Sequence, residues 1–303
     1  MVNTESSGNN GVIIEESAPI NTEMSNATKD SNEDCTIHED TTIINDLKIG
    51  YCIYGHGENR MLFICGGVGC YKKDYPDCVL SAFNPSVYTI VCIDPPGYGT
   101  SRPPDRKQEV NRCMKDAGFC IKLMEHLHMT PFSVVGWSEG SRTAIHVANQ
   151  GKQYVKSMIL LSAGSRVDYR GAGIFRGMRN TEQWLPDAME AYLKFYSKEY
   201  VTKQWADLCD VVQQVYDLLG GRFPCDYVLP NLKLPVLVLT GGMDRFCADP
   251  KYFTTVLPNC KTVSQLLGGH DFYVKYSRWF SDQVTEFLDE NGILIPDNSI
   301  SEA

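Results

Sequence analysis

Short apolar runs recur along the middle of the chain, separated by longer segments with helical spacing. Continuous apolar runs of this length are typical of strands that are buried on both faces of a parallel sheet. Val110–His128 and Ser141–Gln150 lie between successive runs, and their spacing predicts helices. The alternation predicts an α/β fold in which helices flank a mostly parallel central sheet. The five runs are Met61–Cys65, Tyr88–Ile93, Phe132–Val135, Ser157–Leu161 and Pro235–Thr240.

The two ends of this pattern predict further elements. Thr42–Asn45 and Leu47–Tyr54 partly alternate polar and apolar residues, as expected of an antiparallel pair with one face in water. After the last apolar run, Lys261–Leu267 predicts one more strand, and a final helix is expected near Tyr273–Glu290.

Residues 166–229 interrupt the alternation of strand and helix. No strong strand is predicted there, and large aromatic side chains fall on segments with helical spacing. We expect a helical cap at 166–229, inserted into an α/β core formed by residues 41–165 and 230–292. The aromatic residues of the predicted cap are Trp184, Tyr192, Phe195, Tyr196, Tyr200 and Trp205.

The net negative charge of the chain is concentrated at its N-terminus. Residues 1–40 hold nine acidic side chains and one lysine, so they carry nearly all of the net charge of −9. Their only apolar cluster is Val12–Ile14, too little to offset the entropy of ordering, which predicts a disordered acidic tail. The rest of the chain is close to neutral and predicts no nucleic-acid partner.

The lack of recognisable targeting signals and the spacing of the cysteines predict where in the cell the protein is located. The chain has no apolar run long enough to cross a membrane, and its N-terminus has neither a secretory signal nor the arginines of a transit peptide. The twelve cysteines are scattered without CxxC pairs, which predicts reduced thiols and no metal cluster. We expect a cytoplasmic protein without a membrane partner, with a mitochondrial location as the alternative.

The strongest chemical signal is Gly136-Trp137-Ser138-Glu139-Gly140. It follows a predicted strand and precedes a predicted helix, which is the context of a nucleophile elbow. The sharp turn leaves room only for glycine two residues on either side, and it places the Ser138 hydroxyl at a helix N-terminus. A chance match in a Gly- and Ser-rich loop is the alternative, and the surrounding strand and helix disfavour it.

A serine nucleophile needs a base and a group that orients the base. His270 lies after Ser138 and beyond the following helix, in a glycine-flanked loop after a strand. Asp244 follows the strand Pro235–Thr240, at the edge of an α/β sheet where catalytic residues collect. The order Ser, Asp, His is the one this elbow requires. Three other carboxylates compete for the role of the acid: Asp210, Asp226 and Asp249.

An oxyanion hole requires two backbone N–H donors. One is expected from Glu139, and the other from Gly67 or Val68 in the loop Cys65–Gly69. A phosphate-binding loop is the rival interpretation, but the third spaced glycine and a following Lys-Ser/Thr are missing.

With these residues in place, the chain resembles the valacyclovirase (biphenyl hydrolase-like) family, α-amino acid ester hydrolases of the α/β-hydrolase fold. The resemblance covers most of residues 41–290 and is most specific at Asp94–Arg106, at the elbow and at Gly177–Trp184 in the cap. It implies the same triad: Ser138, Asp244 and His270.

The resemblance also assigns a role to Glu139. In that family an acidic residue directly after the nucleophile binds the protonated amine of the substrate, and Glu139 replaces the family's usual aspartate. The alternative is structural, because an acidic side chain in the first turn of a helix stabilises the helix dipole.

Together these observations predict a serine hydrolase that cleaves small carboxylic esters, α-amino acid esters above all, through an acyl-enzyme and without a metal or organic cofactor. A monomer or weak homo-oligomer is expected. The alternatives are a carboxylesterase, thioesterase or carbon–carbon bond hydrolase, or a non-catalytic ligand-binding protein of the same fold. Haloalkane dehalogenases and epoxide hydrolases use an aspartate nucleophile, which the serine at position 138 disfavours.

Overall fold

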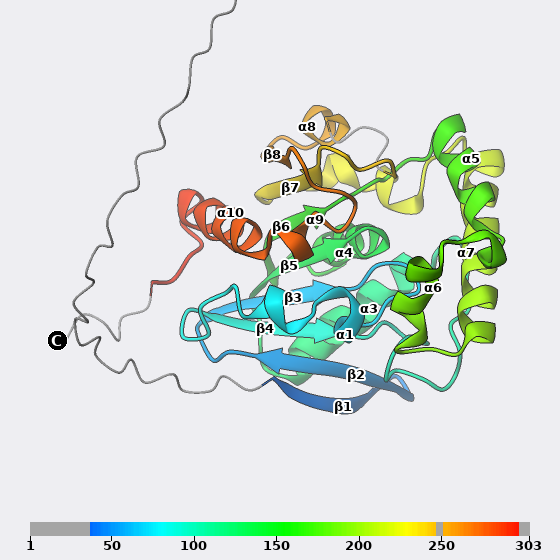
Figure 1. Ribbon diagram of the computed structural model, residues 1–303. Coiled ribbons are helices and arrows are strands. Elements are labelled where there is room, and N and C mark those ends of the chain that lie inside the picture. Colours follow the sequence, from blue (N-terminus) through cyan, green and yellow to red (C-terminus); the bar gives the residue numbers. More distant parts are fainter. Residues whose placement is uncertain (1–36, 247–250, 297–303) are drawn as a thin grey trace, which may run out of the picture. The chain divides into compact units, whose positions relative to one another are not determined.

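The computed structural model of the protein describes residues 37–246 and 251–296. Two sequence predictions fall outside the described residues: the tail through residue 36, with its cluster Val12–Ile14, and the candidate acid Asp249. The described part contains an eight-stranded sheet in the order β1-β2-β4-β3-β5-β6-β7-β8 (Figure 1). The predicted α/β architecture is confirmed.

The sheet is parallel except at one edge. β2 pairs antiparallel with both β1 and β4, and every other neighbouring pair is parallel. The central strands β3 to β7 are almost wholly buried, which explains why apolar runs predicted them. The strands are β1 His38–Ile44, β2 Leu47–Tyr54, β3 Asn59–Ile64, β4 Tyr88–Ile93, β5 Phe132–Trp137, β6 Val155–Leu161, β7 Val236–Gly241 and β8 Cys260–Gln265.

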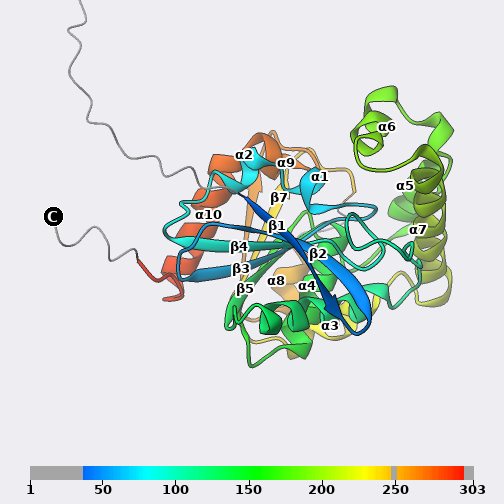
Figure 2. The ribbon, with the colours of Figure 1, turned by 90° about the horizontal axis from the view of Figure 1, so that it is seen from below.

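Helices cover both faces of this sheet (Figure 2). α3 and α4 lie on one face, and α10 lies on the other with the short helices α1, α2 and α9. Each face buries its own apolar cluster, so the core is divided by the sheet into two layers. These helices, with α8, are α1 Tyr71–Asp74, α2 Asp77–Leu80, α3 Arg112–His126, α4 Glu139–Gln150, α8 Tyr252–Val256, α9 Phe272–Lys275 and α10 Ser277–Glu290.

A helical segment stands between β6 and β7, at the right of the sheet in Figure 1. It comprises α5 Tyr169–Met178, α6 Pro186–Leu193 and α7 Lys198–Leu218, with short 3₁₀ turns at Thr181–Gln183, Pro224–Tyr227 and Leu229–Asn231. We call residues 166–231 the cap. The longest helix, α7, buries one side at a spacing of three and four residues, which holds it against the rest of the protein. That side consists of Val201, Trp205, Leu208, Val212 and Val215.

Three boundaries differ from the sequence predictions. β1 starts at His38, so the prediction of disorder through residue 40 is wrong for its last three residues; their side chains are exposed, and no apolar alternation could reveal the strand. β8 ends at Gln265 because the chain turns there, with the N–H of Gly268 donating to Gln265 O. The final helix is broken at Tyr276 into α9 and α10.

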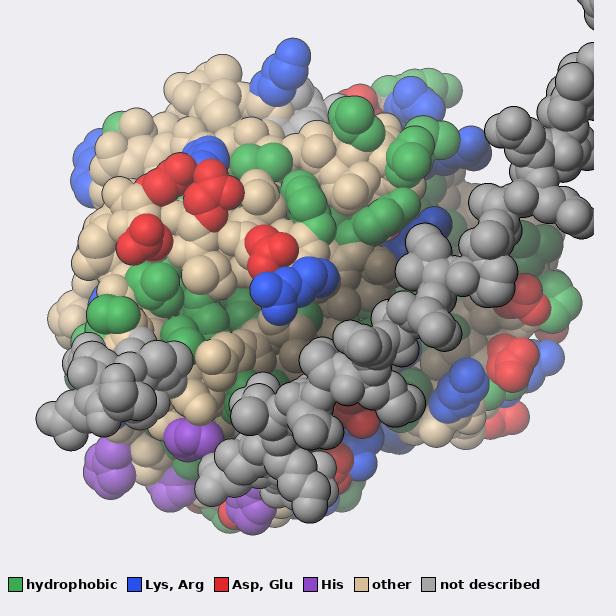
Figure 3. Space-filling view, turned by 60° about the vertical axis from the view of Figure 1, so that its left-hand side comes forward, with side chains coloured by type: hydrophobic (Ala, Val, Ile, Leu, Met, Phe, Trp, Pro, Cys, Tyr) green, Lys and Arg blue, Asp and Glu red, His purple; other side chains and the backbone are tan. Residues whose placement is uncertain are grey.

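The described surface mixes charges. On the face seen in Figure 3, basic and acidic side chains are interspersed. None of the described helices combines the length and the apolarity that a membrane crossing requires. The ten described cysteines are free thiols, and most of them are buried in the core.

Candidate active site

The chain turns sharply between β5 and α4, and Ser138 occupies the turn. Its φ of 53° and ψ of −114° lie in a region that non-glycine residues rarely adopt. A Cβ added at Gly136 would approach Gly140 O to 2.3 Å, and one at Gly140 would approach Ile64 O to 2.3 Å. Both glycines are therefore required by close backbone approach, and the strained serine between them has the geometry of a nucleophile elbow.

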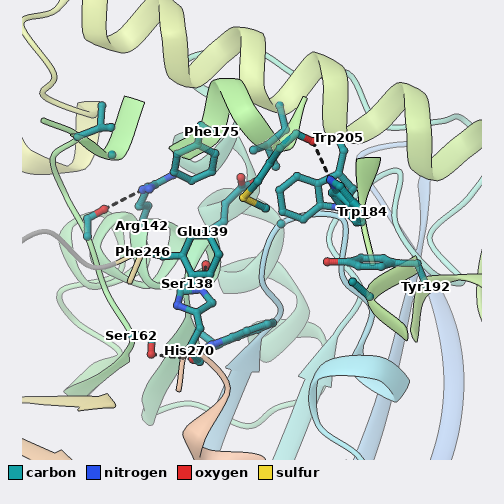
Figure 4. Close-up of a pocket in the computed structure, with 18 of the residues that line it drawn as sticks. Ser138, Glu139, Arg142, Ser162, Phe175, Trp184, Tyr192, Trp205, Phe246 and His270 are labelled. Atoms are coloured by element: carbon teal, nitrogen blue, oxygen red, sulfur yellow. Dashed lines mark hydrogen bonds between the residues drawn. The ribbon is translucent and has the colours of Figure 1, made fainter. Parts of the chain in front are cut away.

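Three loops bring Ser138, His270 and Asp244 together at the carboxyl ends of β5, β8 and β7. Figure 4 shows Ser138 and His270 side by side. His270 Nε2 lies 2.9 Å from Ser138 Oγ, and His270 Nδ1 lies 2.9 Å from Asp244 Oδ2. The Asp244 side chain is only 1% exposed, whereas that of His270 is 22% exposed. A carboxylate that accepts from Nδ1–H leaves Nε2 free to accept the serine proton.

Further hydrogen bonds hold the acid and the base in position. The N–H of Phe246 donates to Asp244 Oδ1 at 2.8 Å. The main-chain oxygen of His270 accepts from Trp137 Nε1 at 2.9 Å and from Ser162 Oγ at 2.8 Å. This hydrogen bond of Trp137 therefore connects the turn that contains Ser138 directly to the loop that contains His270.

Two loops offer backbone amides beside Ser138. Gly67 lines the same cavity as Ser138, and the next residue, Val68, is buried with a φ of 52°. Glu139 is the first residue of α4, so its N–H has no acceptor within the helix. Within the described part of the chain, the amides of Gly67, Val68 and Glu139 have no backbone or side-chain acceptor. These are the three residues expected to form the oxyanion hole.

A cavity of about 380 Å³ lies between the cap and the sheet and contains Ser138 and His270. Apart from Arg166, its cap side is apolar and strongly aromatic. In Figure 4, Arg142 lies on one side of Ser138, and Trp184, Trp205 and Tyr192 lie on the other. The cap contributes Arg166, Val167, Gly171, Phe175, Met178, Trp184, Leu185, Ala188, Tyr192, Trp205 and Leu208, and the core contributes Gly67, Trp137, Ser138, Glu139, Arg142, Ser162, Gly164, Phe246 and His270.

Glu139 lines this cavity, but its carboxylate is already paired. Arg112 donates to both oxygens, from Nε to Oε1 at 2.9 Å and from Nη2 to Oε2. A second guanidinium, that of Arg106, lies 3.7 Å from Oε1 and also binds Asp116. Burial opposes ionisation of Glu139, but the charge and hydrogen bonds of Arg112 outweigh it and lower its pKa to about 2.

The comparisons with known proteins agree with this fold. A family model described as alpha/beta hydrolase fold matches residues 59–194. Serine hydrolase BPHL of Mus musculus is 29% identical over 81% of this chain and 84% of its own length, and that of Homo sapiens is 26% identical over the same shares. The protein is a serine hydrolase of the α/β-hydrolase fold. Its homology to BPHL confirms the resemblance found in the sequence.

A solved structure extends the likeness of fold. The crystal structure of a His-tagged serine hydrolase involved in carbazole degradation matches with a TM-score of 0.66 and 19% identity. The match covers 84% of this chain and all of that one, so the serine hydrolase described here and that enzyme share the whole α/β-hydrolase architecture.

The competing carboxylates of this hydrolase lie elsewhere. Asp210 pairs with Arg179 on the cap, and the buried Asp226 pairs with Arg166 and Arg222. Asp249 lies outside the described residues. Within residues 37–246 and 251–296, no three His, Cys, Asp or Glu side chains are grouped in a way that could hold a metal ion.

Sequence reasoning missed the arginines of the hydrolase's site. Arg112 is the first residue of α3, where the helix dipole disfavours a cation. An arginine near the start of a predicted helix therefore indicates a nearby negative charge, and this could have been recognised in the sequence. Arg142 is the only Lys, Arg, Asp or Glu in the otherwise uncharged segment Ser141–Gln150. A charged side chain on a helix that packs against a sheet signals either an ion pair or a ligand.

Proposed function

We propose that the protein hydrolyses carboxylic esters through an acyl-enzyme on Ser138. The observation that carries this proposal is the chain of two 2.9 Å contacts from Ser138 Oγ through His270 to Asp244. Such a chain converts a weakly nucleophilic hydroxyl into an effective nucleophile, because the base removes the proton as the new bond forms.

In the first half of the reaction, His270 Nε2 takes the Ser138 proton while Oγ attacks the ester carbonyl. Asp244 stabilises the imidazolium and keeps its Nδ1–H in place. His270 then donates the proton to the departing alcohol, and the acyl group remains on Ser138. In the second half, water loses a proton to Nε2 as it attacks the carbonyl of the acyl-enzyme. Nε2 then returns this proton to Ser138 Oγ as the bond between Oγ and the acyl carbon breaks, which releases the acid and restores the serine.

Backbone amides stabilise the tetrahedral intermediates. The N–H of Glu139 and that of Gly67 or Val68 are assigned to the oxyanion, because Gly67 and Glu139 line the cavity with Ser138 and none of the three amides has another acceptor in the described structure. The α4 N-terminus adds a favourable dipole at the same place.

Labelling with a fluorophosphonate tests the assignment directly. We expect one covalent adduct per chain on the tryptic peptide that contains Ser138, with loss of p-nitrophenyl butyrate hydrolysis in proportion to labelling. Heat-denatured protein is the control and should not react, because the activated serine depends on the fold. An adduct on Ser162 instead, or full activity after complete labelling, would contradict the proposal.

Specificity for α-amino acid esters through Glu139 stays a prediction, and the contacts argue against it. A substrate ammonium at this carboxylate would have to share it with Arg112 and approach Arg106, both positively charged. The Glu139 side chain is 7% exposed, so little of its surface faces the cavity. We therefore propose an esterase that does not require a substrate amine.

A pair of esters decides this point. We expect the N-acetylated form of an aminoacyl benzyl ester to be hydrolysed with a kcat/KM at least equal to that of the free amine, because the ammonium gains no unpaired carboxylate. The two esters share the alcohol and the acyl carbon chain and differ only at the nitrogen, which is an ammonium in one and a neutral acetamide in the other. Benzyl alcohol release is measured for both. A preference of tenfold or more for the free amine would restore amine recognition by Glu139.

A further inference from the structure

Arg142 is a cavity residue that the proposed reaction does not use. It lies on α4 four residues after Ser138, and its partly buried side chain lines the cavity between the cap and the sheet. Its Nε donates to Gly164 O at 2.8 Å, and its Cζ lies 3.5 Å from the centre of the Phe223 ring. These contacts fix the guanidinium in place and leave its two Nη groups as donors.

The other arginines around the cavity are paired with carboxylates. Arg112 binds Glu139, Arg106 binds Asp116, and Arg166 and Arg222 share Asp226. Among the described residues, no Asp or Glu lies within ion-pair distance of Arg142. Two arginines line the cavity itself: Arg166 is paired with Asp226, and Arg142 has no carboxylate partner in the described part of the chain.

Arg142 is not needed to balance Glu139. That carboxylate already has Arg112 on both oxygens and Arg106 at 3.7 Å, and Arg142 lies beyond ion-pair distance from it. Burial lowers the pKa of Arg142, yet a guanidinium stays protonated at neutral pH. Glu139 acts on Arg142 only from beyond ion-pair distance, and a bound anion would supply the direct ion pair that the described residues do not provide.

We propose that Arg142 binds a carboxylate of the substrate, so that the esters preferred by this hydrolase carry a negative charge on the side of Ser138 that faces Phe175. The inference rests on the proposed function and names the substrate class of the same site. The two free Nη groups match the two oxygens of a carboxylate.

The layout of the cavity further defines the substrate. Arg142 follows Ser138 by about one helical turn and both side chains line the same cavity, so a short acyl chain can contact both. On the opposite side of Ser138, Trp184, Tyr192 and Trp205 form an aromatic wall (Figure 4). The geometry points to monoesters of short dicarboxylic acids whose alcohol part is apolar or aromatic.

Matched esters test the proposal. Monobenzyl glutarate carries the carboxylate, and benzyl pentanoate has an acyl chain of the same length without it. We expect the wild-type protein to hydrolyse monobenzyl glutarate with a kcat/KM about 10- to 100-fold higher, as one charged hydrogen-bonded contact allows. The succinate and adipate monoesters then show which chain length spans the distance from Ser138 to Arg142.

Substitution of Arg142 locates the effect. In Arg142→Gln, which keeps an amide donor for Gly164, the ratio of kcat/KM between the charged and the neutral ester is expected to fall to about one. Arg142→Lys keeps the charge and should retain part of the preference. Arg176→Gln is the matched control, because it removes an exposed arginine from α5 that does not line the cavity; it should leave the ratio unchanged. Thermal melting of each variant reports folding separately.

The outcomes separate the two proposals. Hydrolysis of benzyl pentanoate without a preference for monobenzyl glutarate, or a preference that survives in Arg142→Gln, overturns the role of Arg142 and leaves the esterase proposal intact. Absence of hydrolysis of every ester, with no fluorophosphonate labelling, overturns the proposed function and the role of Arg142 with it.

Discussion

Replacing Ser138 with alanine is expected to lower kcat by roughly 10⁶-fold on any ester that the protein hydrolyses. The substitution removes the atom that forms the covalent bond, and neither His270 nor the backbone amides can supply another nucleophile of equal strength. Binding should persist, since the cavity walls are unchanged. Burst kinetics and kcat with p-nitrophenyl butyrate measure the loss, and calorimetric titration with a product acid measures binding to the inactive variant.

A second serine of the same cavity provides the matched control for Ser138→Ala. Ser162→Ala removes a hydroxyl that donates to the main-chain oxygen of His270 at 2.8 Å. Loss of one such hydrogen bond is expected to reduce kcat by about tenfold at most. If the two alanine variants lost activity equally, Ser138 would have no special part in the chemistry.

Asp244→Asn should reduce kcat by about 10⁴-fold while leaving the fold intact. An asparagine amide can donate to His270 Nδ1, which favours the tautomer with a proton on Nε2, and that nitrogen can then no longer accept the proton of Ser138. The missing negative charge also destabilises the imidazolium. Steady-state kinetics measure the loss, and circular dichroism verifies the fold.

The control for Asp244→Asn makes the same chemical change at an exposed ion pair. Asp210→Asn removes the partner of Arg179 on the cap surface and should change kcat by less than about twofold. The double variant Ser138→Ala/Asp244→Asn should be no slower than Ser138→Ala alone, because the three residues act as one unit. Retention of more than a tenth of the activity in Asp244→Asn would remove Asp244 from this unit.

Much of the sheet could be predicted from the sequence because its strands are buried on both faces. The run Tyr88–Ile93 coincides with β4, and the runs at β3, β5, β6 and β7 are correct to within two residues. Strand boundaries are predicted incorrectly where the strand residues are exposed to solvent. β1 begins with exposed polar residues, and the two leucines after β8 lie in a turn, about three-quarters exposed, although they read as strand.

The candidate site divides in the same way. Ser138, Asp244 and His270 each follow a strand of one parallel sheet, so local patterns and the order of the chain place them at a common edge. The partner of Glu139 could not be predicted, because Arg112 lies 27 residues away and reaches it only when α3 packs beside α4. A sequence motif identifies a charged side chain, but the packing of the helices decides whether that charge is paired within the protein or can bind a substrate.

The buried pair of Arg112 and Glu139 has a consequence for how this cavity can change over evolution or in the laboratory. Removing Arg112 alone would leave a buried carboxylate without its main partner, at a cost of about 3–5 kcal/mol. Shortening Glu139 to aspartate would draw the carboxylate away from the same guanidinium. Positions 112 and 139 are therefore expected to change together, because a substitution at either position alone lowers the stability of the folded protein. A library that varies only position 139 will therefore miss combinations that are stable only when position 112 changes as well.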